Sequence, residues 1–591
     1  MYESRLRSWR IPQPRYFVDL RTDVKAASAV HDAVNWPIEW MQTMKAWLFI
    51  LVSVLVILPA RAIAATAELH ANFGSTTGTI NAELCGVNHG VLAVNMPGYA
   101  YNGSNGVDLT SEYNWCGVKW IRTDEIAAGD ILSVFPSGDS GDVFNASNYH
   151  FTNLDAYLAP CINNGNKIIF RLGYSTKYTW EDPYTRWYPP TNYDRYATIC
   201  RNTYKHLCKN SFGVNGHTWP ITYWEFYNEP ENPLGTVWTG TATQFAQLYR
   251  KVVNALKAED SSVKVGGYGA WQLDASGNID TSEGRFMDDF LDYCQSNSVA
   301  LDFFSFHYYS DYGSTVRDQA AHIRSALDSH GYTNAEIINT EWASGTGSNN
   351  DTATEAAMMA SSLILDQNSD VSKAFYYAGS PMAGFIWGMW DWNSSPPDAR
   401  KKGFYGFTTY AMLAYHTPIM CSASGPEAMT PPLAGKNAAA TDARILITNH
   451  RCDTYNTYHV NVTNLPFSDW TYTLFVVDSS NNLANCASRT GSGTSFQVTI
   501  TNVTYPSIYV LDFAKRYYST SPPARISTPS NGVVNIKCFG VPTSNYVVQT
   551  TTNLGAPWCA VSTNAAGDDG SWQFTDPNAT RAQQYYRVVQ P

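Results

Sequence analysis

The chain has 591 residues, a formal net charge of −11, 15% charged residues and 14% aromatic residues. This length exceeds what one hydrophobic core organises, so we expect two or three domains. The acidic balance, without basic runs, argues against nucleic acid or an anionic membrane surface as a partner. The many aromatic side chains are typical of sugar-binding clefts and also of large buried cores.

A short apolar run stands near the start of the chain. Residues 46–58 read AWLFILVSVLVIL, follow Met44-Lys45 and precede the small residues of PARAIA. This pattern predicts a cleavable secretory signal near residues 41–64, and the run is shorter than the roughly 20 residues of a membrane span. We therefore expect residues 1–65 to be an N-terminal extension and signal peptide, and the protein to be secreted, periplasmic or at the cell surface.

Eleven cysteines are consistent with an oxidising compartment, although the odd number leaves at least one thiol unpaired within the chain. Two candidate disulfides each lie within one expected domain and join Cys452 with Cys486 and Cys538 with Cys559. No group of Cys and His residues has the spacing of zinc ligands, so we expect no metal and no cofactor.

Eight apolar segments alternate with stretches of helical period between residues 83 and 392. The expected strands are 83–90, 118–125, 166–174, 221–229, 262–269, 301–309, 335–342 and 383–392. From Thr241 the intervening sequence has one apolar stripe at helical spacing, and Thr241 and Gln244 are spaced as a capping box. Buried strands that alternate with helices predict an α/β fold, a (β/α)₈ TIM barrel over residues 66–420.

The chain after the barrel has the pattern of β structure without helices. Alternating apolar residues predict a β-sandwich domain over 421–517, a Pro- and Ser-rich linker over 518–532, and a small C-terminal all-β module over 533–591. We expect the sandwich to cover the side of the barrel. The last module either contacts polysaccharide or the cell surface, or spaces the barrel from it.

The stretch WEFYNEPE, residues 224–231, holds three glutamates at the end of the fourth expected strand. Side chains alternate along a strand, so Glu225 and Glu229 share one face, and Glu229 stands at the C-terminal end, where TIM barrels place their reacting groups. We expect Glu225 to be a barrel-interior carboxylate paired with a cation such as Arg171. Glu231 is expected in solvent.

A second carboxylate, Glu341, ends the seventh expected strand. Both Glu229 and Glu341 then face the barrel mouth from opposite sides. Two carboxylates across a pocket permit glycoside hydrolysis, and in the retaining reaction they stand about 5 to 5.5 Å apart. One attacks the anomeric carbon, while the other protonates the leaving oxygen and later activates water.

Several stretches resemble glycoside hydrolase family 39, the family of β-xylosidases and α-L-iduronidases in the retaining (β/α)₈ clan. The resemblance covers roughly residues 86–415, and its matching stretches are WEFYNEPE, VWTGTATQFAQLYRKVVNALK, VKVGGYGA, LDFFSFHYYS, INTEWAS and GFIWGMWDW. It implies that Glu229 is the acid/base and Glu341 the nucleophile. The substrate-binding positions that we carry over or add as candidates are Asn228, His307, Tyr309, Arg122, Trp387, His89 and Trp238.

These positions have individual expected roles. Asn228 contacts the 2-hydroxyl of the sugar, Tyr309 supports the nucleophile, and Arg122 keeps Glu341 ionised. Trp387 forms the floor of the sugar site. His307 and His89 are alternatively satisfied core histidines, and Trp238 is alternatively a packing residue.

The chain departs from the family at two places. Arg122-Thr123-Asp124 replaces the usual Arg-x-His, and Trp392-Asn393 stands where the xylosidases have acidic residues. The sugar therefore stays open, with an exo-acting β-xylosidase-like enzyme on plant or algal polysaccharide fragments as the main hypothesis. An endo-acting glycanase of the same clan and a non-catalytic carbohydrate-binding protein on an inactive barrel are the alternatives.

Overall fold

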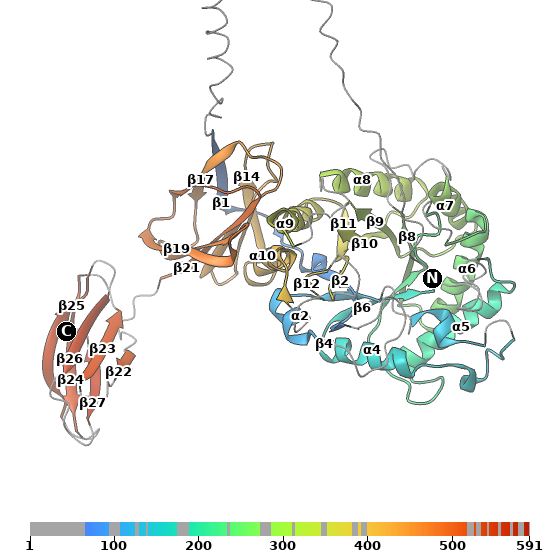
Figure 1. Cartoon of the computed structure of the whole chain (residues 1–591), viewed down its shortest axis with the longest axis horizontal. Helices are drawn as coiled ribbons and strands as arrows, with labels where there is room; N and C mark the ends of the chain where they lie inside the picture. The colour runs from blue at the N-terminus through green and yellow to red at the C-terminus, as the bar shows by residue number, and fades with distance from the viewer. Residues whose placement is uncertain are drawn as a thin grey trace, which may run out of the picture. The chain divides into compact units, whose positions relative to one another are not determined.

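A computed structural model shows how the chain folds (Figure 1). It describes residues 65–93, 107–123, 129–137, 140–173, 188–232, 237–271, 285–309, 314–343, 351–380, 388–391, 399–516, 525–527, 533–539, 543–552, 557–567, 571–576 and 584–589. The predicted signal segment lies outside these ranges. Within them, no helix combines the length and the apolar character that crossing a membrane requires.

Eight parallel strands close into a barrel, and β11 pairs with β2 to complete the ring. In barrel order the strands are β2 (Gly86–Asn88), β5 (Trp120–Arg122), β6 (Lys167–Leu172), β7 (Tyr223–Phe226), β8 (Lys264–Ala270), β9 (Phe303–Tyr309), β10 (Glu336–Ala343) and β11 (Val371–Tyr376). The strands are buried along nearly their whole length, as parallel strands covered by helices must be. The predicted (β/α)₈ barrel is confirmed.

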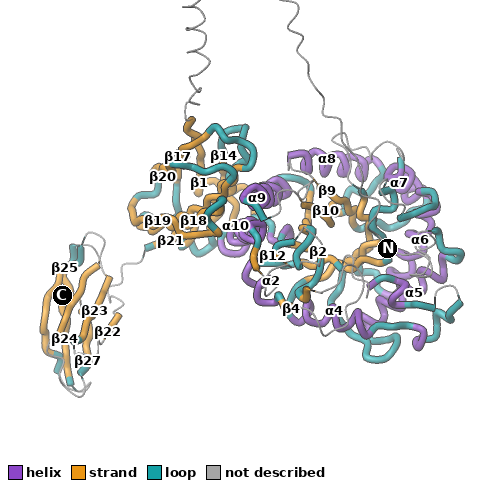
Figure 2. Tube along the Cα trace, viewed as in Figure 1, coloured by secondary structure: helices purple, strands orange, loops and turns teal. Residues whose placement is uncertain are grey.

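Helices surround these strands, as Figure 2 shows in purple. They are α2 (Thr110–Cys116), α3 (Ile131–Val134), α4 (Thr152–Asn163), α5 (Tyr193–Lys209), α6 (Ala242–Glu259), α7 (Phe286–Ser296), α8 (Ser314–Ser329), α9 (Ala353–Gln367) and α10 (Lys402–His416), with 3-10 turns at η2 (Ala82–Leu84) and η4 (Ala146–Asn148). The capping box of α6 forms as predicted, because the Thr241 hydroxyl accepts the Gln244 N–H and the Gln244 side chain accepts the Thr241 N–H.

The eighth barrel strand is not where the sequence pattern placed it. The strand is β11, which pairs with β10 and β2, whereas the described residues of the predicted segment 383–392 contribute β12 (Trp390–Asp391), paired with β13 (Ala399–Arg400). The sequence of β11 includes Ser372 and Lys373, so it lacks the continuous apolar run of the other strands. Residues 381–387 lie outside the described part of the chain.

A nine-stranded sheet holds the second core. Its order is β19 (Asn482–Ser492), β18 (Asp469–Val477), β21 (Ser507–Lys515), β16 (Asp442–Asn449), β15 (Leu433–Lys436), β14 (Ile419–Ser424), β1 (Ala65–Thr79), β17 (Tyr455–Thr463) and β20 (Phe496–Thr501). Trp470 of β18 stacks on Phe496 of β20 at 4.3 Å between ring centroids, although these strands lie near opposite ends of the order. One sheet thus folds over its own core and forms both faces of the predicted sandwich.

Strand β1 belongs to this sheet, although the sequence analysis assigned residues 66–79 to the barrel domain. It runs parallel to β17 and antiparallel to β14. Alternate residues of β1 are buried in the core of the sheet, namely Ala67, Leu69, Ala71 and Phe73. This alternation with period two is that of a strand with one solvated face. Hydrogen bonds also join the sheet to barrel helices, such as the Thr448 hydroxyl of β16 to the Ala357 carbonyl of α9 at 2.7 Å.

The last part of the chain contains two three-stranded sheets in its described residues. One is formed by β22 (Arg525–Ser527), β23 (Val534–Phe539) and β26 (Ser571–Asp576), and the other by β25 (Cys559–Ala565), β24 (Asn545–Thr551) and β27 (Tyr585–Val589). Tyr546 stacks on Trp572 at 5.5 Å between ring centroids and joins the sheets in one small core.

The two predicted disulfides are wrong, because all eleven cysteines are free thiols. In each predicted pair one thiol is buried and the other is exposed. Cys452 and Cys538 are buried in cores, whereas Cys486 and Cys559 face solvent.

Candidate functional site

The backbone leaves the strand conformation directly after β7. Tyr227 and Glu229 have φ angles of 73° and 47°, a left-handed conformation that is uncommon for residues other than glycine and clusters at functional sites. The Glu229 N–H donates to the Gly269 carbonyl at 2.9 Å, which ties this turn to β8. The regular alternation of side chains along the strand ends here, so Asn228 and Glu225 both contact Arg122.

Glu229 and Glu341 meet at the C-terminal end of the barrel. Glu229 follows β7, Glu341 lies near the end of β10, and His307 of β9 stands between them. One carboxylate oxygen from each glutamate and one nitrogen of His307 lie within 4.8 Å of one another. Nδ1 of His307 is 2.6 Å from Oε1 of Glu229 and 3.4 Å from Oε2 of Glu341. The two predicted carboxylates therefore lie close enough to act on the same sugar residue.

Glu341 is held in its ionised form by the groups around it. Arg122 Nη1 donates to Oε1 at 2.6 Å, and the Tyr309 hydroxyl donates to Oε2 at 2.8 Å. A guanidinium only donates hydrogen bonds and keeps its charge, so it favours the carboxylate form of its partner. Burial raises the pKa of Tyr309 well above its ordinary value, and the Glu341 charge adds to that rise, so Tyr309 remains a donor.

Arg122 is itself fixed by three further acceptors. Its Nε donates to Glu225 Oε2 at 2.5 Å, its Nη2 to Asn228 Oδ1 at 2.7 Å and its Nη1 to Asn88 Oδ1 at 3.2 Å. The side chains of Arg122 and Glu225 are both fully buried. Glu225 is thus the predicted interior carboxylate, but its cation is Arg122 and not Arg171.

Glu229 has a different environment. Its Oε1 faces His307, and its Oε2 accepts the Asn232 side-chain amide at 2.8 Å. In the described part of the chain, Glu229 thus contacts a neutral amide and an imidazole ring, and no guanidinium contacts it. Two carboxylates in unlike surroundings are able to take unlike roles, one as a proton carrier and one as a permanent anion.

Glu231 is buried and not in solvent as the sequence analysis expected. Only 4% of the residue is exposed, and Oε1 accepts the Trp271 N–H at 2.8 Å. Burial raises the pKa of Glu231 to about 8, and the charge of Glu229 adds to this effect. Folding therefore favours the protonated form of Glu231, two residues from Glu229.

The three remaining predicted positions are His89, Trp238 and Trp387. His89 lies next to the network, since its ring meets Tyr377 edge to face at 5.4 Å and Tyr377 meets Tyr309 at 6.3 Å. Trp238 is 5% exposed and packs edge to face against Tyr227 and Phe245, so it supports the turn and does not present a face to a ligand. Trp387 lies outside the described residues.

Sequence reasoning missed Asn88 and Asn232, which contact Arg122 and Glu229. Asn88 ends the first barrel strand, beside the candidate His89. Its position at the C-terminal end of a barrel strand is the signal that points to the site. Asn232 gives no such signal, because it follows Pro230 in a loop.

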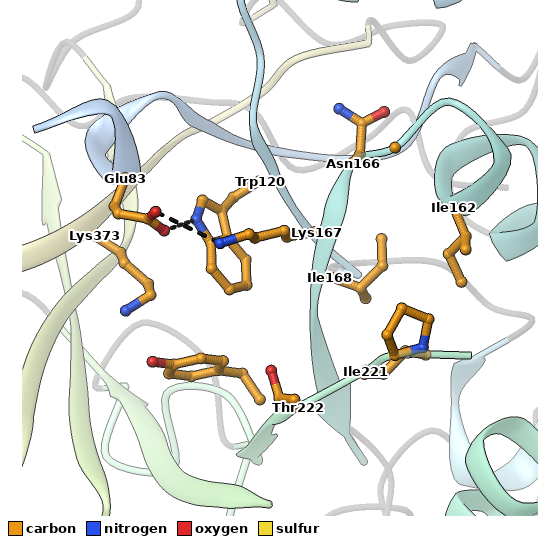
Figure 3. Close-up of a pocket in the computed structure, with 12 residues that line it drawn as sticks. Glu83, Trp120, Ile162, Asn166, Lys167, Ile168, Ile221, Thr222 and Lys373 are labelled. Atoms are coloured by element: carbon orange, nitrogen blue, oxygen red, sulfur yellow. Dashed lines mark hydrogen bonds and ion pairs between the residues drawn. The ribbon is translucent and has the colours of Figure 1, made fainter. Parts of the chain in front are cut away.

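A cavity of about 580 Å³ lies at the opposite end of the barrel, where the strands begin (Figure 3). Trp120, Lys167, Tyr223 and Lys373 line it, together with Glu83. Its charges are paired, because Glu83 Oε1 lies 2.6 Å from Lys119 Nζ and 3.5 Å from Lys167 Nζ, and Lys373 contacts Glu336. We do not take this cavity as the active site, since TIM barrels carry their active sites at the opposite end, where the strands finish.

Comparison with known proteins agrees with the geometry. Residues 105–381 match the model of the Glycosyl hydrolases family 39. A β-xylosidase from Caldicellulosiruptor saccharolyticus is 26% identical over 203 residues, which are 33% of this chain and 37% of that protein. The chain therefore aligns with little more than a third of the length of this relative.

Two solved structures show the same fold. A glucosidase from Croceicoccus marinus has a TM-score of 0.63 at 20% identity, covering 77% of this chain and 100% of that one. An enzyme of the same numbered family from Xanthomonas axonopodis pv. citri has a TM-score of 0.58 at 14% identity, covering 78% and 100%.

Proposed function

The barrel is a glycoside hydrolase domain of family 39, and from this premise we propose that the protein is a secreted enzyme that hydrolyses glycosides with retention of configuration. The separation of Glu229 and Glu341 carries the proposal, with carboxylate oxygens within 4.8 Å of each other. Retaining enzymes hold their carboxyl groups about 5 to 5.5 Å apart, whereas inverting enzymes need about 6.5 to 9.5 Å to admit a water molecule.

The roles follow from the unlike environments of the two glutamates. Glu341, ionised beside Arg122, attacks the anomeric carbon, and the bond from that carbon to the leaving oxygen breaks as Glu229 gives this oxygen its proton. In the second step water attacks the same carbon, Glu229 takes the proton of the water, and the ester bond to Glu341 breaks. Both carboxyl groups return to their starting state.

Asn228 has an amide group beside the two glutamates in the proposed mechanism. Its carbonyl oxygen accepts from Arg122 at 2.7 Å, so its amide NH₂ points away from the guanidinium. We propose that this NH₂ binds the 2-hydroxyl of the sugar, a contact that strengthens as charge develops in the transition state. The same arginine thereby orients both the nucleophile and the sugar-binding amide.

The proposed substrate is a β-xyloside at the end of a plant or algal oligosaccharide. The name of the Caldicellulosiruptor relative supports this class. Product analysis decides the mode of action. Release of xylose alone from xylo-oligosaccharides supports exo action, and a ladder of shorter oligosaccharides supports an endo-acting glycanase instead.

Aryl β-D-xylosides test the reaction, with aryl glucosides and arabinosides as alternatives. Glu341→Gln and Glu229→Gln should each lower kcat/KM by on the order of 10³-fold or more. Proton NMR of the first turnovers should show β-xylose before mutarotation, and a 2-fluoro xyloside should label Glu341 covalently. First release of α-xylose refutes retention. Activity that both variants keep refutes the catalytic assignment, and no hydrolysis of any glycoside by the unaltered chain supports a non-catalytic barrel.

Two further proposals concern location. We propose that the signal near residues 41–64 directs secretion, supported by its sequence pattern, and N-terminal sequencing of the exported protein tests the cleavage site. We also propose that the module 533–591 contacts polysaccharide. A chain shortened after residue 516 should then bind insoluble xylan less than the full chain while it keeps activity on aryl glycosides.

A further inference from the structure

A cluster of two histidines and an aspartate lies outside the barrel mouth. Asp155 belongs to α4, His206 to the last turn of α5, and His217 to the connection that leads from α5 into β7. We propose that Asp155, His206 and His217 bind one Zn²⁺ ion, or a similar divalent transition metal, and that this ion stabilises the entry into β7. Metal binding contradicts our expectation from sequence spacing.

The distances suit a small metal ion. His206 Nε2 lies 3.0 Å and 3.1 Å from the two oxygens of Asp155, and His217 Nε2 lies 3.3 Å from Oδ1 of the same carboxylate. All three ligand atoms fall within 4.8 Å of one another. Tetrahedral zinc with bonds of about 2.0 to 2.2 Å holds its ligand atoms roughly 3.3 to 3.6 Å apart, so both distances from a histidine nitrogen to the Asp155 carboxylate lie within a few tenths of an ångström of these values.

The protons of His206 require a cation in the cluster. Its Nδ1 is 3.0 Å from the Phe212 carbonyl, which only accepts, so Nδ1 carries a proton. In the neutral ring Nε2 then presents a lone pair to the carboxylate of Asp155, which presents lone pairs as well. Either a second proton on His206 or a metal ion relieves this repulsion. A histidine whose other N–H donates to a backbone carbonyl is the usual arrangement of a metal ligand.

His217 favours the metal over the second proton. Its Nε2 is buried and has no hydrogen-bond partner in the described part of the chain, although it faces Asp155 at 3.3 Å. If His206 carries a second proton, it donates a hydrogen bond to Asp155, and Nε2 of His217 still has no hydrogen-bond partner among the described residues. A single metal ion would instead be coordinated by Nε2 of both histidines. Imidazole nitrogens with one carboxylate suit zinc, cobalt, nickel or copper and do not suit calcium or magnesium, which prefer oxygen ligands.

Aromatic side chains hold both rings in place. His206 stacks on Phe151 at 3.8 Å between centroids and 7° between planes, and His217 stacks on Trp219 at 3.7 Å and 6°. The backbone is tied as well, since the His217 N–H donates to the His206 carbonyl at 2.6 Å. The ligands are therefore ordered before an ion arrives, which lowers the entropy cost of binding.

The effect of the ion should be on stability. The segment that holds His217 continues through Trp219 into β7, which ends at Phe226, and Asn228 and Glu229 stand in the turn that follows. No ligand of the proposed ion belongs to the set around Glu229 and Glu341, so hydrolysis does not require the metal. A metal-loaded chain should unfold at a temperature about a few degrees higher than the stripped chain, because the ion binds only the folded state.

The test uses the untagged full-length chain, stripped with chelator and titrated with Zn²⁺ in a calorimeter, with Co²⁺ absorption as a second readout of tetrahedral geometry. We expect one ion per chain. His217→Ala and Asp155→Asn should each weaken binding by on the order of 10²-fold or more, and both should lose the thermal shift. Circular dichroism confirms folding, and the isosteric Asp155→Asn variant serves if His217→Ala fails to fold.

Two control variants locate the ion. His459→Ala removes a histidine paired with Glu68 in the nine-stranded sheet, at 2.8 Å, and should leave binding unchanged. Glu341→Gln alters the other group of close carboxylates and histidine, and should also leave it unchanged. The proposal is overturned if the stripped chain takes up no Zn²⁺ at 100-fold molar excess, if the Asp155→Asn chain binds as the unaltered chain does, or if Glu341→Gln abolishes binding.

Discussion

Replacing Arg122 with methionine removes a cation that Glu225 and Glu341 share. The arginine donates hydrogen bonds of 2.5 Å to Glu225, 2.6 Å to Glu341 and 2.7 Å to Asn228. The side chains of the two glutamates are 0% and 7% exposed, so water does not replace the guanidinium. Breaking a buried ion pair costs about 3 to 5 kcal/mol, a large share of the roughly 5 to 15 kcal/mol that stabilises most proteins.

The activity of the Arg122→Met variant should fall by on the order of 10²-fold or more, because the nucleophile loses its charge partner. Adding Glu225→Gln separates stability from catalysis. The second change replaces an orphaned carboxylate with a neutral amide and should recover about 1 kcal/mol or more of stability. It should not recover activity, since Glu341 still lacks the guanidinium.

Urea unfolding followed by tryptophan fluorescence measures stability, and hydrolysis of aryl β-D-xylosides measures activity. Arg444→Met is the matched control, because Arg444 pairs with Asp512 at 3.0 Å within the nine-stranded sheet and the variant should keep full activity. Recovery of activity in the Arg122→Met/Glu225→Gln chain would refute the reasoning, since it would mean that Arg122 acts only by keeping the barrel folded.

Three other substitutions test separate parts of the structure. The pKa of Glu231 rises on folding to about 8, so its contribution to stability is largest below about pH 4.3 and declines as pH rises to 8. Glu231→Gln should remove that decline in a series of melting temperatures from pH 5 to 8, and a parallel decline in the variant would argue against it. Burial alone would raise the pKa of Glu336, but the charge of Lys373 and the hydrogen bonds that Glu336 accepts outweigh burial, so the pKa of Glu336 lies below its ordinary value. The ion pair of Glu336 and Lys373 therefore stabilises the fold above about pH 4.5, and this stabilisation is lost as pH falls. Lys373→Met should therefore lower the melting temperature more at pH 7 than at pH 3.5 and leave kcat unchanged, and an equal loss at both pH values would contradict the ion-pair explanation. Gly269 has φ of +60°, and a Cβ there would lie 2.9 Å from His307 Nε2, so Gly269→Ala should cost about 1 kcal/mol and reduce kcat by displacing His307. Unchanged kcat in that variant would show that the position of His307 does not matter for turnover.

Local pattern predicted those barrel strands whose burial is visible in their own sequence. Seven of them are apolar runs followed by helical stretches, and Glu229 and Glu341 were found because strand ends point to the barrel mouth. The eighth, β11, escaped because Lys373 makes it look solvated. The charge is neutralised by Glu336 on the neighbouring strand, a contact between residues far apart in the chain.

The same limit applies to the site. Glu231 reads as a loop residue, and its burial depends on the Trp271 N–H at the end of β8. The partner of Glu225 was misassigned to Arg171, which lies on the adjacent strand and so seemed near. Arg122 reaches Glu225 from two strands away, across the barrel interior, and no spacing in the sequence encodes that distance.

The place of β1 has a consequence for how the chain is made. Glu68 of β1 contacts His459 of β17, 391 residues later. At translation rates of about 5 to 20 residues per second, β1 waits roughly 20 to 80 seconds for this neighbour. Because β1 lies between β14 and β17, its loss would detach the paired strands β17 and β20 from the remaining strands of the sheet. The first strand of the described chain is thus the inner template on which two late strands dock.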